Sequence, residues 1–239
     1  MKRKDVSMSN RNIVLLKMSG EALGLFDHEV LLRVVAEIGK LIAADIGVAI
    51  VIGGGNLIRG AEFASEHIAP EIADYMGLKA TEINGLALLT CFNHAKIPAK
   101  LLSACGTSAH IEEYEPERAQ VHLRNGQVVI LSGGTGKTGC TTDTAAVLRA
   151  KEIGATLLIK ATKVDGVYDK DPKKFPDAKF LPTVTCTDAL EKRLKIMDKQ
   201  AFELFQTCPG LSMRIINMTR AGEILAAGLG ENRGSLVTN

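Results

Sequence analysis

Three glycine-rich turns, each directly after an apolar run, carry most of the residues in this chain that could do chemistry. The first is Lys17-x-Ser19-Gly20, the second is residues 53–56, and the third is residues 132–144. Glycines let backbone N–H groups approach an anion closely, and the N-terminus of a following helix adds a favourable dipole. We therefore predict that these turns bind phosphate along one crevice.

The third turn is the most informative of the three. It runs from the apolar residues 128–131 through Gly133-Gly134-Thr135-Gly136-Lys137-Thr138 to Asp143. The P-loop pattern G-x-x-x-x-G-K-[ST] needs a glycine where this chain has Leu131, so the turn is not a P-loop. Asp143 leaves two interpretations open, because an aspartate at a helix start is either a cap or a functional carboxylate.

Two lysines are candidates for neutralising a transferring phosphoryl group. Lys17 follows the first predicted strand and Lys160 follows the fifth. The two ammonium groups could act on one phosphoryl group from two sides. Each could instead be a solvated lysine beside an ordinary turn. Arg59 likewise suits either a bidentate phosphate contact or a surface ion pair.

Apolar runs alternate with helical patterns along most of the chain. We predict strands at 13–16, 48–52, 100–102, 128–131, 156–159 and 213–217, and helices at 29–44, 71–95, 145–153, 190–205 and 221–229. Residues 169–182 hold three prolines and are predicted to form a long exposed loop. Near-continuous apolar strands that alternate with helices predict an α/β fold, with helices on both faces of a largely parallel sheet.

Composition limits the class of protein. The chain has 239 residues, of which 46% are apolar and 23% charged, and its net charge is +2. It lacks the basic excess typical of nucleic-acid binding, and no apolar run reaches the ~18 residues of a membrane span. The five cysteines show no CxxC spacing, which is typical of reduced thiols in a cytoplasmic protein. We expect no nucleic-acid partner and no membrane partner.

Together the motifs resemble the amino-acid-kinase superfamily, and within it the family of bacterial uridylate (UMP) kinases. The matching segments are spread over nearly the whole chain: residues 17–23, 51–56, 74–77, 83–87, 141–146, 160–168, 194–198 and 217–218. The resemblance implies a three-layer α/β/α sandwich. It also implies ATP-dependent phosphorylation of UMP to UDP with Mg²⁺, in pyrimidine nucleotide synthesis, by a cytoplasmic homohexamer. We expect a flexible tail at 1–11 and one domain at 12–239, with an acceptor-side lobe to about 159 and an ATP-side lobe from about 160.

The resemblance assigns residues to two sites and to catalysis. Lys17 and Lys160 would clamp the transferring group, and Asp143 would orient a lysine or hydrated Mg²⁺ carried with ATP, without direct protein ligands. Asp198 is a further carboxylate candidate. The ATP site would comprise Lys17, Met18, Ser19, Gly20, Gly55, Arg59, Thr162, Tyr168 and Asp171. The UMP site would comprise Gly54, Asp74 on the ribose, Thr135, Gly136, Lys137, Thr138, Gly139, Cys140, Thr141 and Thr142.

The implied chemistry agrees with these residue types. A phosphate oxygen of UMP is already ionised near neutral pH, so the reaction needs no strong general base. Catalysis would then consist of positioning and charge neutralisation.

Two segments depart from the family pattern. Where the family usually has Gly-Asn-Pro-Phe-Phe-Thr-Thr-Asp, this chain has Gly-Lys-Thr-Gly-Cys-Thr-Thr-Asp at 136–143, without the proline and the two aromatics. We hypothesise that the added Lys137 contacts a phosphate. The loop at 23–27 is shorter than the glycine-containing loop that the family links to GTP activation, so GTP activation stays open, while the resemblance implies inhibition by UTP.

Two other functions fit the same residues. One is a kinase of the superfamily with a different acceptor, such as an amino acid or carbamate, and the other is a catalytically idle nucleotide-binding protein. Asp74 and the run at 141–144 favour UMP as the acceptor. An idle binder would not need Lys17, Lys160 and Asp143 together.

Overall fold

The structure is a computed structural model, and it describes residues 11–23, 27–59, 62 and 67–239. The tail predicted at 1–11 therefore lies outside the described residues except for Arg11. Most of the short loop at 23–27 lies outside them too. None of the helices within the described ranges is long and apolar enough to cross a membrane.

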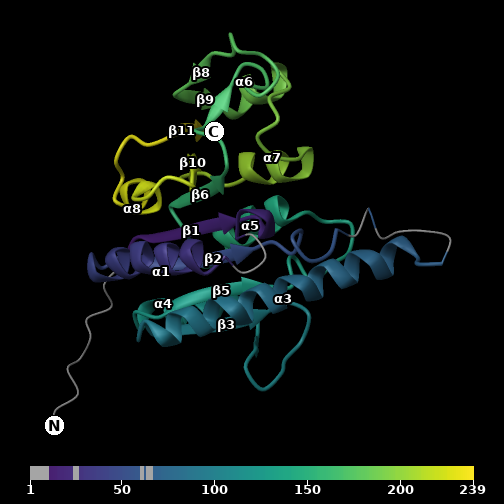
Figure 1. Cartoon of the computed structure of the whole chain (residues 1–239), viewed down its shortest axis with the longest axis vertical. Helices are drawn as coiled ribbons and strands as arrows, with labels where there is room; N and C mark the ends of the chain where they lie inside the picture. The colour runs from purple at the N-terminus through teal and green to yellow at the C-terminus, as the bar shows by residue number, and fades with distance from the viewer. Residues whose placement is uncertain (1–10, 24–26, 60–61, 63–66) are drawn as a thin grey trace.

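One sheet runs through the whole molecule and forms its middle layer (Figure 1). Over the described residues it has nine strands in the order β4-β3-β5-β2-β1-β6-β10-β11-β9. Every neighbouring pair is parallel except β10 with β11. The strands are β1 Ile13–Met18, β2 Gly47–Ile52, β3 Ala99–Ser103, β4 Glu112–Glu113, β5 Val128–Ser132, β6 Leu157–Thr162, β9 Thr183–Thr185, β10 Ser212–Asn217 and β11 Ser235–Thr238.

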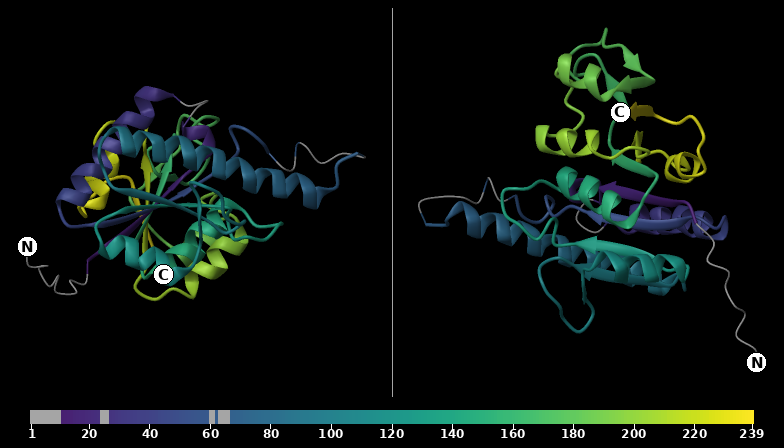
Figure 2. Two further views of the ribbon diagram at one scale, coloured as in Figure 1. Left: turned by 90° about the horizontal axis from the view of Figure 1, so that it is seen from below. Right: turned by 180° about the vertical axis from the view of Figure 1, so that it is seen from behind.

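Helices cover both faces of this sheet, which confirms the predicted three-layer α/β/α sandwich (Figure 2, left). One face carries α1 His28–Ala43, α3 Pro70–His94 and α8 Glu223–Gly228. The other carries α4 Pro116–Arg124, α5 Thr142–Ile153, α6 Cys186–Glu191 and α7 Lys199–Gln206. A short 3-10 helix, η1 Gly20–Leu23, follows β1.

The central strands read as continuous apolar runs because both of their faces are buried. In β1, Val14, Leu16 and Met18 pack into the core beneath α1 and α3, while Leu15 packs into the core beneath α5. Successive side chains of a strand point to opposite faces, so Lys17 faces the α5 side together with Leu15. The same alternation in β6 puts Lys160 on that side with Leu158.

The single helix predicted over 190–205 is wrong, because the chain forms two helices there. Helix α6 ends at Glu191, and Arg193 then adopts a left-handed conformation with φ 51°, which an α-helix cannot contain. Helix α7 starts afresh after Asp198, whose carboxylate caps it by accepting from Ala201 N at 2.9 Å. The apolar pattern continues through the break because Leu194 packs in the same core as both helices.

Several short elements have no strong sequence pattern and were not predicted. The segment 169–182 is not a loop throughout, because β8 Phe180–Leu181 pairs with β7 Val167–Tyr168 as an antiparallel hairpin. Strands β4, β9 and β11 have two to four residues each, too few for a readable alternation. Helix α4 has one signal that sequence analysis could have used, the proline at its first position.

Candidate active site

Lys17 and Lys160 meet a single carboxylate at the centre of the sheet. They are register partners on β1 and β6, two strands that run parallel. Lys17 Nζ lies 2.8 Å from one oxygen of Asp143, and Lys160 Nζ lies 2.6 Å from the other. Lys160 Nζ also donates to the Ile196 carbonyl oxygen. Both lysines lie within the last two or three residues of their strands rather than after them, so their positions are fixed by the sheet.

Asp143 reaches the lysines because it stands in the first turn of α5. The cap of that helix is Thr141, whose hydroxyl accepts from the backbone N–H groups of Asp143 and Thr144 at 3.1 and 3.2 Å. The capping interpretation of Asp143 is therefore wrong, and its carboxylate is free to bind both ammonium groups. The N-terminal end of α5 adds to the favourable field on this anion.

The three charged groups are mostly withdrawn from water. The side chains of Lys17, Lys160 and Asp143 are 10%, 15% and 16% exposed. Burial works against the charge of Asp143, but Lys160 and Lys17 outweigh it and hold the pKa of this carboxyl below its ordinary 3.8. Burial lowers the pKa of Lys160 below its ordinary 10.5; Asp143 opposes this shift and Lys17 adds to it. Two cations therefore share the carboxylate of Asp143, and the nearby Asp198 also favours the charged form of Lys160.

Asp198 ties the end of the third turn to α7. Besides capping α7, its carboxylate accepts from the hydroxyl of Thr144 at 3.3 Å and from that of Thr141. Both oxygens of Asp198 therefore accept hydrogen bonds from protein groups, and two of these groups lie at the N-terminal end of α5, which carries Asp143. Asp198 supports the position of Asp143 from the opposite helix.

The first and second glycine turns pack directly against each other. A side chain at Gly20 would overlap Asn56, and one at Gly53 would lie 3.0 Å from the backbone nitrogen of Gly20. The buried Asn84 of α3 holds this contact, donating to Gly53 O and to Asn56 Oδ1 at 2.7 Å each. In the sequence, Asn84 stands within the family-like segment 83–87, and no residue pattern there predicts this role.

Close packing, not backbone strain, explains Gly54. Its Cβ would lie 2.7 Å from Gly77 O and 2.8 Å from Ala80 Cβ, so only a glycine lets the turn rest on α3. Gly55 is more open, because an added Cβ would meet its nearest atom, Glu21 Oε1, at 3.6 Å. The ligand contacts predicted for both glycines stay predictions.

Arg59 lies beside the second turn and is 47% exposed. Its guanidinium pairs with Glu21 and, at 3.1 Å, with Glu62, while Nε donates to Gly55 O at 3.4 Å. The structure therefore places Arg59 next to a predicted phosphate-binding glycine and engages it in exposed ion pairs. Exposed pairs of this kind are weak, so a phosphate could displace them.

The third turn continues into a loop at 133–141 that Asp74 holds at its far end. Asp74 Oδ2 accepts from Gly139 N at 2.8 Å, which brings together two parts of the predicted UMP site from α3 and from the loop. Gly136, Lys137, Thr138 and Gly139 are exposed, and Cys140 is half-buried. Within the loop, Lys137 N donates to Thr135 Oγ1 at 3.2 Å.

Two cavities open on the α5–α7 and β7–β8 parts of the molecule. A cavity of about 550 Å³ includes two of the three catalytic candidates in its lining. It is lined by Asp143, Lys160, Ala189, Leu190, Arg193, Leu194, Lys195, Ile196, Met197, Lys199 and Phe202. One of about 320 Å³ is lined by Asp165, Tyr168, Phe180, Asn217, Arg220, Glu223, Asn232, Arg233 and Gly234. The Tyr168 ring packs edge-on against Phe180, with centroids 5.5 Å apart.

The other residues predicted on the ATP side form local contacts. The hydroxyl oxygen of Thr162 lies 2.9 Å from Val164 O and 3.1 Å from Ile216 O, either of which can accept its one proton, and Asp171 accepts from Lys173 N at 3.0 Å. Neither residue lines either of the two cavities. Among the described residues, no three His, Cys, Asp or Glu side chains gather closely enough to hold a metal ion.

The chain is similar to known proteins over most of its length. The model of the amino acid kinase family matches residues 12–217. The uridylate kinase of Methylococcus capsulatus is 44% identical over 229 residues, which cover 94% of this chain and 95% of the relative. The uridylate kinase of Wolinella succinogenes is 45% identical over 230 residues, which also cover 94% of this chain and 95% of the relative.

Solved structures show the same relationship. The UMP kinase of Bacillus anthracis superposes with a TM-score of 0.90 at 32% identity, covering 95% of this chain and 96% of its own. The UMP kinase of Ureaplasma parvum gives 0.88 at 31% identity, covering 96% and 99%. With its paired lysines, its shared aspartate and these relatives, the chain belongs to the amino acid kinase family, among the uridylate kinases.

Proposed function

We propose that this chain transfers the γ-phosphoryl group of ATP to UMP and produces UDP and ADP, within pyrimidine nucleotide biosynthesis. The observation that carries the proposal is the Lys17–Asp143–Lys160 triad, with two ammonium groups held on one carboxylate at the centre of the sheet. Relatives that match almost the whole chain are uridylate kinases, which supports UMP as the acceptor.

The triad suits direct in-line transfer. An oxygen of the UMP phosphate attacks the γ-phosphorus, and the bond from that phosphorus to the β,γ-bridging oxygen breaks, so that ADP leaves with the electron pair. Negative charge spreads over the transferring group, and Lys17 and Lys160 stabilise it from adjacent strands. Because both lysines are fixed in the sheet, little reorganisation accompanies the transfer.

Asp143 orients the lysines in this proposal. Both of its oxygens are bonded to ammonium groups, so it suits a positioning role better than direct metal binding. Mg²⁺ would enter with the ATP phosphates, which supply most of its oxygen ligands, and it would neutralise charge on the β- and γ-phosphates. A water of its hydration shell could contact Asp143.

The two substrates would lie on opposite sides of the triad. Lys17, Met18, Ser19, Gly20, Gly55 and Arg59 would hold the ATP phosphates, and Thr162, Tyr168 and Asp171 would line the nucleoside side. Gly54, Asp74 and residues 135–142 would hold UMP. Asp74 is already bonded to the 133–141 loop, which supports a shared role in one site.

We further propose a cytoplasmic homohexamer that UTP inhibits. Ile72, Tyr75 and Ile83 of α3 are apolar and 45–55% exposed, and their spacing places them along one side of the helix. Such a stripe is typical of a surface that another subunit covers. Sedimentation of the protein at micromolar concentration would test the assembly, because a monomer would contradict it.

Transfer of label tests the reaction itself. ATP labelled in the γ-phosphate, UMP and Mg²⁺ are incubated with the protein, and the nucleotides are separated. We expect the label in UDP and none in ADP. Label that stays in ATP, while a binding assay shows that ATP and UMP both bind, would support the idle binder instead.

A further inference from the structure

The 133–141 loop carries almost nothing that could pack into the core. Four of its residues are glycines with positive φ: Gly133 at 73°, Gly134 at 56°, Gly136 at 80° and Gly139 at 74°. Glycine loses more conformational entropy on ordering than any other residue. The aromatics and the proline that the family usually has here are absent, so this loop depends on hydrogen bonds from its surroundings.

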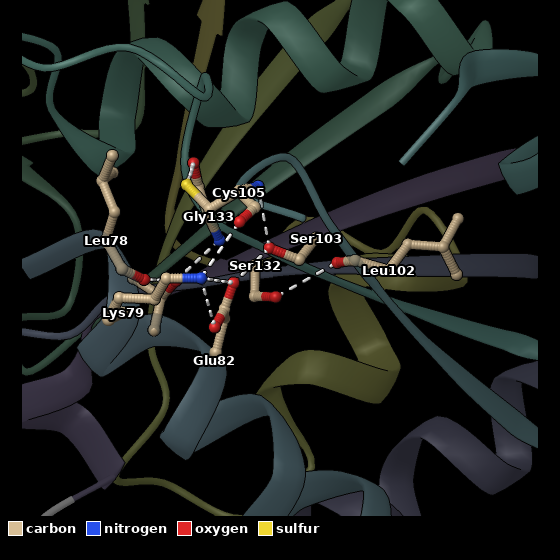
Figure 3. Close-up of polar contacts among 9 residues, drawn as sticks. Leu78, Lys79, Glu82, Leu102, Ser103, Cys105, Ser132 and Gly133 are labelled. Carbon is tan, nitrogen blue, oxygen red and sulfur yellow. Dashed lines mark hydrogen bonds and ion pairs between the residues drawn. The ribbon is translucent and has the colours of Figure 1, made fainter. Parts of the chain in front are cut away.

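Helix α3 holds both ends of the loop. Asp74 accepts from Gly139 N at one end, and at the other end Thr81 Oγ1 accepts from Gly133 N at 2.7 Å. The carbonyl oxygen of Gly133 accepts from the thiol of Cys105, with Sγ at 3.4 Å (Figure 3). Burial raises the pKa of the Cys105 thiol, so it keeps the proton that it donates.

An ion pair of α3 fixes Cys105 in turn. Lys79 Nζ lies 3.1 Å from both oxygens of Glu82 and donates to Cys105 O at 3.0 Å. Glu82 is buried, and its Oε1 accepts from Ser103 Oγ at 2.6 Å. Ser103 Oγ itself accepts from Cys105 N at 3.0 Å. Figure 3 shows how the pair thereby holds both backbone polar groups of Cys105.

The Gly133 end has no room to adjust. A Cβ at Gly133 would lie 2.7 Å from Ser103 Oγ, 2.8 Å from Ala104 N and 2.9 Å from Cys105 N. The ends of β3 and β5 therefore press directly against each other, and a shift of Cys105 moves Gly133. Because Asp74 holds Gly139 independently, such a shift changes the span of the loop.

We propose that the Lys79–Glu82 pair positions the 133–141 loop through Cys105 and Gly133, and thereby sets the affinity for the nucleotide acceptor. Both are positioning residues that act through the loop. The inference rests on the proposed function for the identity of the acceptor, UMP, but the path from α3 to the loop does not depend on it.

Lys79→Met tests the proposal, because methionine keeps most of the length of the side chain and removes its charge and its donors. We expect the KM for UMP to rise about fivefold, with kcat and the KM for ATP within about twofold of wild type. Lys100→Met is the matched control. The side chain of Lys100 is 41% exposed, against 40% for Lys79, and it also pairs with a glutamate, Glu112. Lys100 lies near the start of β3, away from Cys105. It should leave all three constants unchanged.

A second variant separates positioning from stability. Lys79→Met with Glu82→Gln leaves no buried charge unpaired, so thermal stability should recover while the KM for UMP stays high. If stability and KM both return to wild type, the pair is merely structural and the proposal is wrong. An unchanged KM for UMP in Lys79→Met would also overturn it.

Amide hydrogen exchange tests the path from α3 to the loop even if the wild-type protein does not phosphorylate UMP. Such a result contradicts the proposed function, whereas faster exchange at 133–139 in Lys79→Met than in Lys100→Met still supports the positioning path. Equal exchange in the two variants would contradict the path itself.

Discussion

Lys17 and Lys160 are register partners on adjacent parallel strands, and each binds a different oxygen of the same carboxylate. Two ammonium groups this close repel each other, and Asp143 compensates that repulsion before any substrate arrives. The sheet fixes both backbones, so the positive charge is organised in advance at one point. This is the arrangement that charge-stabilised phosphoryl transfer requires.

Neutralising either lysine should remove most of the catalysis. We expect Lys17→Met and Lys160→Met each to lower kcat by about 10²-fold or more, because each loses a preorganised charge on the transferring group. Lys40→Met, an exposed lysine of α1, is the control and should match wild type. Steady-state kinetics of folded variants decide this, and a loss below about tenfold would show that the sheet lysines do not stabilise the transition state.

Asp143→Asn should change the dependence of stability on pH. Because the folded pKa of Asp143 lies below 3.8, its ionised form stabilises the protein above that value, and this stabilisation is lost as pH falls through the folded pKa. At pH 7 the free energy of unfolding of the variant should be about 3 kcal/mol or more below that of wild type, because the two buried lysines no longer have a carboxylate partner. Urea unfolding from pH 7 to pH 3 should show the difference from wild type shrinking at acid pH. A constant difference would contradict the ion triad.

Gly54→Ala should destabilise the protein through a clash with α3. The added Cβ would lie 2.7 Å from a backbone oxygen, and relief requires a shift of the helix, at a cost of about 1–3 kcal/mol. Gly77→Ala is the natural comparison, because its Cβ meets nothing within 4 Å and alanine favours the helix by up to about 1 kcal/mol. Thermal unfolding of both variants checks this, and equal midpoints would rule out the packing explanation for Gly54.

Lys137→Ala tests the hypothesis that this exposed lysine of the 133–141 loop contacts a phosphate. Loss of one exposed charge contact should raise the KM for UMP about three- to tenfold and leave the KM for ATP unchanged. Lys163→Ala, exposed at the end of β6, provides a comparison of the same chemistry outside the loop. If the KM for UMP does not change in Lys137→Ala, Lys137 does not contact the phosphate of UMP.

The parts of the fold with strong periodicity could be predicted, and the parts that depend on tertiary contacts could not. The buried runs of β1, β2, β5 and β6 and the long α1 follow from composition and spacing alone. Strand β11 exists because it pairs with β10 and β9, which no local pattern reveals. The break between α6 and α7 depends on the left-handed Arg193, and an arginine carries no signal for that conformation.

The candidate site divides in the same way. Residue types and spacing pointed to Lys17 and Lys160, because charged residues at the ends of parallel strands converge on one edge. For Asp143, at the start of a helix, they left a cap and a functional carboxylate both open, and its functional role came from the resemblance to the kinase family. The shared carboxylate depends on the register of β1 with β6, which sequence alone does not fix. The roles of Asn84, Lys79 and Glu82 come from contacts across α3 and β3, so they needed the structure.

The most direct measurement is coupled ADP release with MgATP and a panel of acceptors: UMP, CMP, dUMP, carbamate, N-acetylglutamate and aspartate. We predict turnover with UMP, at a kcat/KM well above that for every other acceptor, and its loss in Lys160→Met. Preferred turnover of another acceptor, or no turnover while ATP still binds, would contradict the assignment and point to the substituted residues 136–140 as its cause.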